Sequence, residues 1–98
     1  MAKYLSLWEI DQTKIPIDPQ QKGAGWGMLM AMVRKDFEKG LITSWGAFVG
    51  EINGYCILEG TELEVHTCAI QYVPFVTFKI HPIVTESHVN EMIKTLMG

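Results

Sequence analysis

The chain has 98 residues, of which 48% are hydrophobic and 19% are charged, a composition typical of one globular domain and not of a disordered chain. Its net charge of −3 comes without a basic stripe, so we expect no nucleic-acid partner. No apolar run approaches the ~20 residues of a membrane span, and Met1 leads into alternating residues instead of the apolar segment of a signal peptide. We therefore expect a cytoplasmic protein without a membrane partner.

The first elements are a strand and a long helix. Residues 4–10 alternate at period two, as strands do, and a turn-rich connector covers residues 11–16. Asp18 and Pro19 then have the order of an N-cap and a first helical residue. This pair predicts a helix start.

The long helix is predicted to run to about Lys39 and to stop at Gly40, a C-cap glycine. Its apolar stripe has helical spacing and consists of Trp26, Leu29, Met30, Val33 and Phe37. Three glycines lie in its first turns: Gly23, Gly25 and Gly27. Each costs up to ~1 kcal/mol of helix propensity relative to alanine, so either that end frays or something packs close to it.

Two strands follow the helix. Residues 42–49 form the first of them, and the pair Asn53-Gly54 marks a tight hairpin. Residues 55–59 are apolar on both faces, which is typical of a central strand.

The last third predicts a helix, a strand and a final helix. Thr61 and Glu64 have capping-box spacing and open a helix that runs to about Tyr72. The fourth strand is the stretch FVTFKIHP, residues 75–82. Thr85 then caps a last helix with one apolar face, made of Val89, Met92, Ile93 and Leu96.

The order β-α-β-β-α-β plus a C-terminal helix is the split βαβ pattern. We predict a single domain, residues 1–98, of the α+β class with a ferredoxin-like fold. The four-stranded antiparallel sheet should have the order 4-1-3-2, with both long helices on one face.

Two helices cover only one face of such a sheet, and side-chain alternation divides the strands between the two faces. The side facing the helices is predicted to hold Leu5, Leu7, Cys56, Leu58, Val76, Phe78 and Ile80. The opposite face is predicted to hold Tyr4, Ser6, Trp8, Tyr55, Ile57, Glu59, Phe75, Thr77, Lys79 and His81, joined by Trp45 and Ala47 if bulges allow. This open face is more apolar than a solvated sheet should be, so we expect a homodimer with sheets packed face to face. Space left between the sheets would suit a small-molecule ligand.

Four stretches of the chain, IPIDP, KDFEKGLITSWGAFVG, NGYCILEG and YVPFVTFKIHPIV, resemble the dimeric α+β barrel superfamily, which includes muconolactone isomerases and haem-degrading monooxygenases. The resemblance implies a homodimer with a cleft between sheet and helices, or between the sheets. It does not imply one reaction.

The catalytic candidates are His81, Lys79 and Glu59. An ordinary histidine titrates near neutral pH and can act as a general acid or base, although a strand-end histidine before Pro82 also forms simple hydrogen bonds to backbone or water. Lys79 could hold an anionic substrate, and Glu59 could be a base. The two could equally form an ion pair on the sheet surface.

The predicted ligand-binding residues all lie on the expected open face. They are Ser6, Trp8, Trp45, Tyr55, Thr77, Lys79 and His81. The aromatic members could stack on a flat ligand or simply fill an interface.

Cofactors and metals are not expected. Cys56 and Cys68 have no metal or redox spacing and are predicted to be reduced core thiols. The histidines share no i, i+4 spacing, so no metal site is predicted. In haem-degrading members of the superfamily a helical histidine ligates haem, but the partner asparagine has no counterpart for His66 here, since Asn53 and Asn90 fall in a turn and a late helix.

Two functions remain open. The first is a cofactor-independent enzyme, a monooxygenase or isomerase, acting on a small and partly apolar molecule. The second is a structural module whose sheet face serves only dimerisation. A cavity too small for a ligand, or filled by Trp8 and Tyr55, would favour the second.

Overall fold

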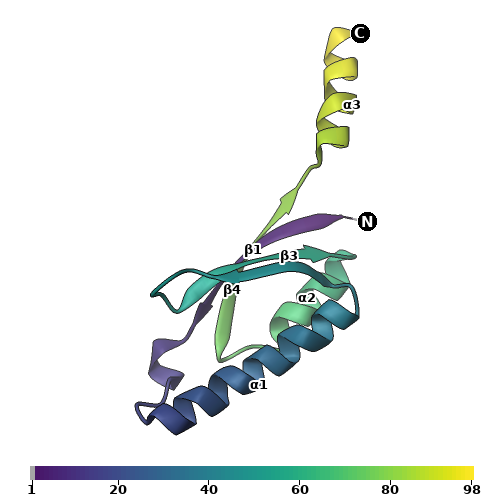
Figure 1. Cartoon of the computed structure of the whole chain (residues 1–98). Helices are drawn as coiled ribbons and strands as arrows, with labels where there is room; N and C mark the ends of the chain where they lie inside the picture. The colour runs from purple at the N-terminus through teal and green to yellow at the C-terminus, as the bar shows by residue number, and fades with distance from the viewer. Residues whose placement is uncertain (1) are drawn as a thin grey trace.

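A computed structural model describes residues 2–98, and its elements follow the predicted order (Figure 1). The strands are β1 (Lys3–Ile10), β2 (Ile42–Ala47), β3 (Asn53–Glu59) and β4 (Val76–Ile83). The helices are α1 (Pro19–Glu38), α2 (Glu62–Ile70) and α3 (Glu86–Met97), with a short 3-10 turn η1 (Gln12–Lys14). The strands form one antiparallel sheet in the order β2-β3-β1-β4, which confirms the predicted topology and the ferredoxin-like α+β fold.

The helix ends lie where local chemistry places them. The Asp18 carboxylate accepts a hydrogen bond from the Gln21 backbone N–H at 3.0 Å, and α1 ends just before Gly40, whose φ of +76° suits glycine. Thr61 and Glu64 form the predicted capping box of α2. The predicted helix boundaries are therefore confirmed at these three ends.

The turn between β2 and β3 does not use the Asn53-Gly54 pair, and that prediction is wrong. The chain turns earlier, through Gly50 at φ +77°, with the Glu51 N–H donating to the Phe48 carbonyl at 3.1 Å. Asn53 and Gly54 belong to β3 itself. Gly54 is needed there because a Cβ atom at this position would collide with the Gly46 carbonyl oxygen and with the ring of Trp8.

The predicted side-chain parity of β1 is also wrong. Tyr4, Ser6, Trp8 and Ile10 are buried on the helix side, whereas Leu5 and Leu7 lie on the open face. The register agrees, because Ser6 pairs with Cys56 and Trp8 pairs with Phe78, and directly paired residues share a face. Both sets of β1 side chains are apolar, so the alternation alone could not choose between them.

The prediction that Trp45 of β2 joins the open face is also wrong. Trp45 pairs with Cys56 and therefore faces the helices, and the expected bulge lies between Ile42 and Ser44. The assignments of the residues within β3 and β4 were correct, since Cys56, Leu58 and Val76 are buried on the helix side. Phe75, predicted on the open face, instead precedes β4 and lines a space with Trp26 of α1.

The core lies between the sheet and helices α1 and α2, which cover one face (Figure 1). Its buried apolar residues include Tyr4, Trp8, Ile10, Val33, Ile42, Cys56, Leu58, Val65, Cys68, Tyr72 and Val76. The predicted stripe of α1 is only partly buried, because Val33 is in the core but Phe37 is 38% exposed.

Helix α3 stands apart from this core (Figure 1). Thr85 caps it as predicted, and His88 completes a capping box in which its Nδ1 accepts from the Thr85 N–H at 3.1 Å. No side chain of α3 is buried. The chain measures 62 × 26 × 18 Å with a radius of gyration of 16.3 Å, above the ~13 Å of a compact chain of about 100 residues.

Replacing Gly54 with alanine should lower the free energy of unfolding by at least about 2 kcal/mol, because backbone and an indole occupy the position of the new methyl group. Gly27→Ala is the matched control. Nothing lies within 4 Å of a Cβ there, and in a helix interior this change should stabilise the protein by about 0.5–1 kcal/mol. Urea unfolding of both variants tests the argument. Equal stability of Gly54→Ala and wild type would contradict it.

Candidate functional site

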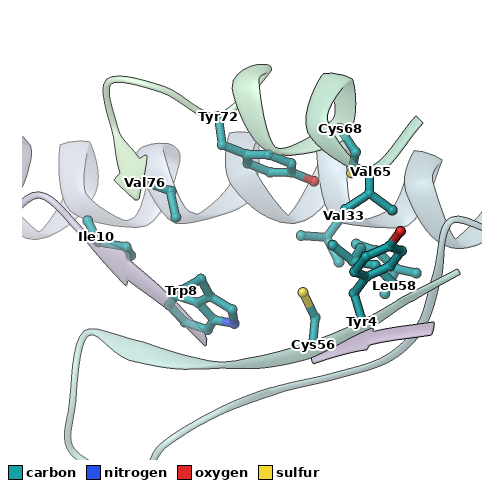
Figure 2. Packing of buried hydrophobic residues seen from close by; sticks show 11 residues of the cluster. Tyr4, Trp8, Ile10, Val33, Cys56, Leu58, Val65, Cys68, Tyr72 and Val76 are labelled. Atoms are coloured by element: carbon teal, nitrogen blue, oxygen red, sulfur yellow. The ribbon is translucent and has the colours of Figure 1, made fainter. Parts of the chain in front are cut away.

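A cavity of about 30 Å³ lies between the sheet and the two covering helices, and we call it the inner cavity. Figure 2 shows Tyr72 and Cys68 on the helix side and Cys56 and Trp8 on the sheet side of this space. Its walls are apolar or aromatic and comprise Trp8, Ile10, Trp26, Leu29, Met30, Val33, Ile42, Trp45, Cys56, Leu58, Cys68, Ala69, Tyr72, Val76 and Phe78. A space of this volume holds only one or two water-sized molecules.

All three tryptophans of the chain meet at one end of the inner cavity. Trp8 stacks on Trp45 at a ring-centroid distance of 5.3 Å with an interplanar angle of 8°. It meets Trp26 edge-on at 6.5 Å and 75°. The Trp8 indole N–H donates to the Tyr55 carbonyl at 3.1 Å, so its orientation is set by both packing and a hydrogen bond.

A buried carboxylate, Asp36 of α1, lies behind the cavity wall and is 2% exposed. It accepts a hydrogen bond from the Tyr72 hydroxyl at 2.7 Å and another from the Cys68 thiol at 3.4 Å. These contacts join α1 to α2 and to the turn that follows it. A buried carboxylate without such donors would strongly destabilise the fold.

The Tyr72 hydroxyl and the Cys68 thiol, which donate hydrogen bonds to Asp36, are held in their protonated forms. Burial, followed by the neighbouring Asp36 carboxylate, raises the pKa of the Cys68 thiol to about 12. Burial and the hydrogen bond to Asp36 also raise the pKa of Tyr72. Cys56, across the cavity, has its pKa raised to about 11, chiefly by burial. These cysteines are therefore unreactive thiols, as the sequence predicts.

Ser6 is the one buried polar side chain whose hydrogen bonding is incomplete within residues 2–98. It is 0% exposed and sits on β1 between Cys56 of β3 and Ile80 of β4. Its hydroxyl adds a polar atom beside the cavity floor but does not line the cavity.

A second space, the outer groove, lies next to the inner cavity. Its volume is about 220 Å³. Ile10, Trp26 and Leu29 line both spaces, so the two are neighbours across these three side chains. The remaining groove residues are Lys14, Ile15, Pro16, Lys22, Gly25, Met28 and Phe75.

The predicted ligand-binding residues fall on two different faces of the sheet. Ser6, Trp8 and Trp45 are on the helix side, and both tryptophans line the inner cavity. Tyr55, Thr77, Lys79 and His81 lie on the open face, because their cross-strand neighbours are Leu7, Glu9, Leu7 and Leu5. The structure therefore does not bring the predicted set together as one site.

The catalytic candidates are similarly separated from the inner cavity. Lys79 and His81 are exposed on the open face. Glu59 pairs with Lys3 at 3.9 Å, so the expected ion pair with Lys79 is wrong; the register puts Lys3 beside Glu59 and Leu7 beside Lys79. His66 is exposed on α2 and touches neither space.

Sequence reasoning missed Asp36 and the part played by Tyr72. A signal for Asp36 does exist, because it follows Leu29 and Val33 at helical spacing and so puts a carboxylate in the apolar stripe of α1. A charged residue in such a stripe must find a buried partner. The identity of that partner depends on how α2 packs on α1.

Within residues 2–98, no three side chains of histidine, cysteine, aspartate or glutamate gather in a metal-binding arrangement. In the same range no helix combines the length and apolarity that crossing a bilayer requires. Comparisons with protein-family models and with curated protein sequences give no match for this chain. The fold class is ferredoxin-like α+β, and the function must be inferred from the two spaces and the open face.

The raised thiol pKa values predict both reactivity and pH dependence. Folding raises the pKa of Cys56 and Cys68 from 9.0 to about 11 and 12, so at pH 8 their thiolate fractions should be at least about 100-fold lower than in the unfolded chain. Ellman's reagent should label them only in urea. Fast labelling of the folded protein would contradict this burial.

The same shifts stabilise the folded state below pH 9, and that stabilisation should be lost as the pH rises from 9 toward 12. Urea unfolding at pH 7 and pH 10.5 measures the loss. The control variant Cys56→Ala/Cys68→Ala should show a smaller drop between the two pH values. An equal drop would assign the effect to other groups.

Proposed function

We propose that this protein binds a small, largely apolar molecule in the outer groove, next to the inner cavity. One observation carries this proposal: the outer groove, about 220 Å³ in volume, is lined mainly by apolar side chains, and three of these, Ile10, Trp26 and Leu29, also line the inner cavity. Ligand sites are typically concave and apolar with a few polar groups. The groove volume of about 220 Å³ is below the ~300–1,000 Å³ of drug-sized sites, which favours a small ligand.

The geometry favours binding over catalysis. A cofactor-independent monooxygenase or isomerase, as the superfamily resemblance implies, needs an acid or base that reaches its substrate. Asp36 already accepts hydrogen bonds from Tyr72 and Cys68 behind the cavity wall. Lys79 and His81 lie on the other face of the sheet. No group of this kind is free at the inner cavity among the residues that line it.

The second part of the proposal is a homodimer formed through the open face of the sheet. This face carries an apolar centre made of Leu5, Leu7, Tyr55, Ile57 and Ile83. Leu7 and Ile83 are each 38% exposed. An apolar patch rimmed by polar residues is typical of an interface, and two copies related by a twofold axis can bury the same patch against itself.

Helix α3 supports the same conclusion. It has 12 residues, the lower limit for a helix that is stable alone in water. Its apolar side chains remain exposed, with Met92 at 51% and Leu96 at 76%. A second copy would supply the surface that this arm lacks in its own chain. Such a dimer would have the architecture of the dimeric α+β barrels that the sequence resembles.

The binding proposal predicts that filling the groove abolishes ligand uptake. Gly25 lines the outer groove, whereas Gly23, two residues earlier on α1, does not. A Cβ atom at either glycine would have no neighbour within 4 Å, so both leucine variants should fold. In isothermal titration, octanol should bind to the wild type and to Gly23→Leu, and at least tenfold more weakly to Gly25→Leu.

Native mass spectrometry of protein purified from its own host provides a second readout. A retained small molecule would support the binding proposal. Failure of octanol to bind, together with a bare protein mass, would leave the interaction module as the better description.

The dimer proposal predicts that a charge on the open face separates the copies. Leu7→Glu/Ile57→Glu should give a monomer by size-exclusion chromatography with light scattering, because an unpaired carboxylate at the centre of an interface is costly. Gln20→Glu, on the exposed surface of α1, should remain dimeric. A wild-type monomer at micromolar concentration would overturn this part of the proposal.

A further inference from the structure

The outer groove has a charged rim that the inner cavity lacks. Lys14, from η1, and Lys22, from the first turn of α1, both line it. No aspartate or glutamate is among the lining residues. Two lysine side chains therefore border an otherwise apolar space.

Neither lysine is committed to another charged side chain. The ion pairs of residues 2–98 join Lys3 to Glu59 and Lys94 to Glu91. Lys14 and Lys22 take part in neither pair. The two lysines of the rim are therefore available to form ion pairs with a negatively charged ligand.

The two carboxylates nearest in sequence, Asp11 and Asp18, are engaged locally. Asp11 accepts from the Thr13 N–H at 3.0 Å and from its hydroxyl at 2.7 Å. These bonds lower the pKa of Asp11, with a smaller effect from Lys14. Asp18 accepts from the Gln21 N–H. Both act as caps, and neither lines the groove.

We propose that the ligand is an amphipathic monoanion, an aliphatic or aryl-alkyl carboxylate, whose charged group lies between Lys14 and Lys22. This inference rests on the proposed binding function and names its ligand class. The apolar body lies along Ile15, Met28 and Phe75 and points toward Trp26 and the inner cavity.

The number and type of cations define the ligand charge. Lysine ammonium groups act as point charges without the forked geometry with which arginine grips phosphate. Two exposed lysines suit one carboxylate better than a di- or triphosphate. The small volume, about 220 Å³, limits the apolar body to a short chain or a single ring.

Isothermal titration with three probes of equal chain length tests this class: octanoate, octanol and octylamine. Octanoate should bind most tightly, about fivefold or more above octanol, the factor that two exposed ion pairs together supply. Octylamine should bind most weakly. Raising the salt concentration should weaken octanoate alone.

The double variant Lys14→Met/Lys22→Met keeps the apolar stems and removes both charges. It should bind octanoate and octanol equally well. Lys35→Met, in the last turn of α1 and outside the groove, should retain the wild-type preference.

The outcomes separate the two proposals. Equal affinity of wild type for octanoate and octanol, or an unchanged preference in the double variant, would overturn the monoanion inference and leave the apolar pocket standing. Absence of binding by all three probes would overturn both.

Discussion

The contact on which the rest of this structure depends is the one between the indole of Trp8 and the backbone at Gly54. The Trp8 ring fits between sheet and helices because the neighbouring strand has no side chain at Gly54, where a Cβ atom would collide with it. Trp8 then stacks on Trp45 and meets Trp26 edge-on. The three rings support α1 above the sheet, since rigid aromatic side chains do not collapse to fill the space beside them. The inner cavity lies beside these rings, and all three tryptophans line it.

Asp36, Tyr72 and Cys68, which we call the Asp36 cluster, lie on the helix side of the inner cavity. Tyr72 and Cys68 line the inner cavity, and because both donate to Asp36, neither offers a free hydrogen-bond donor on the cavity wall. Removing one donor would leave a buried acceptor short of a partner, which costs about 1–3 kcal/mol. The cluster therefore connects α1 to α2 in one relative position. A polar group held in the core in this way is compatible with a structural role, and it makes the cavity a place for apolar contact.

The two faces of the sheet differ in what covers them. The helix side encloses the proposed ligand space, whereas the open face and α3 offer apolar surface that the chain itself does not cover. A chain of 98 residues buries only a modest core, and association is a common way for such chains to gain stability. Binding and dimerisation are thus proposed for opposite sides of one sheet. Lys79 and His81 belong to the association side.

Local chemistry was enough to predict much of this protein. The caps at Asp18, Thr61 and Thr85, and the order of the elements, depend on residues close together in the sequence. The face chosen by β1 was not predictable in this way, because both of its faces carry apolar side chains and the choice depends on tertiary contacts such as that of Trp8 with Gly54. The pairing of Asp36 with Tyr72, 36 residues apart, and the meeting of Lys14 with Lys22 at one groove also arise only when the helices pack. Alternation and capping act within a few residues, whereas cavities and polar clusters are made by segments that only tertiary structure brings together.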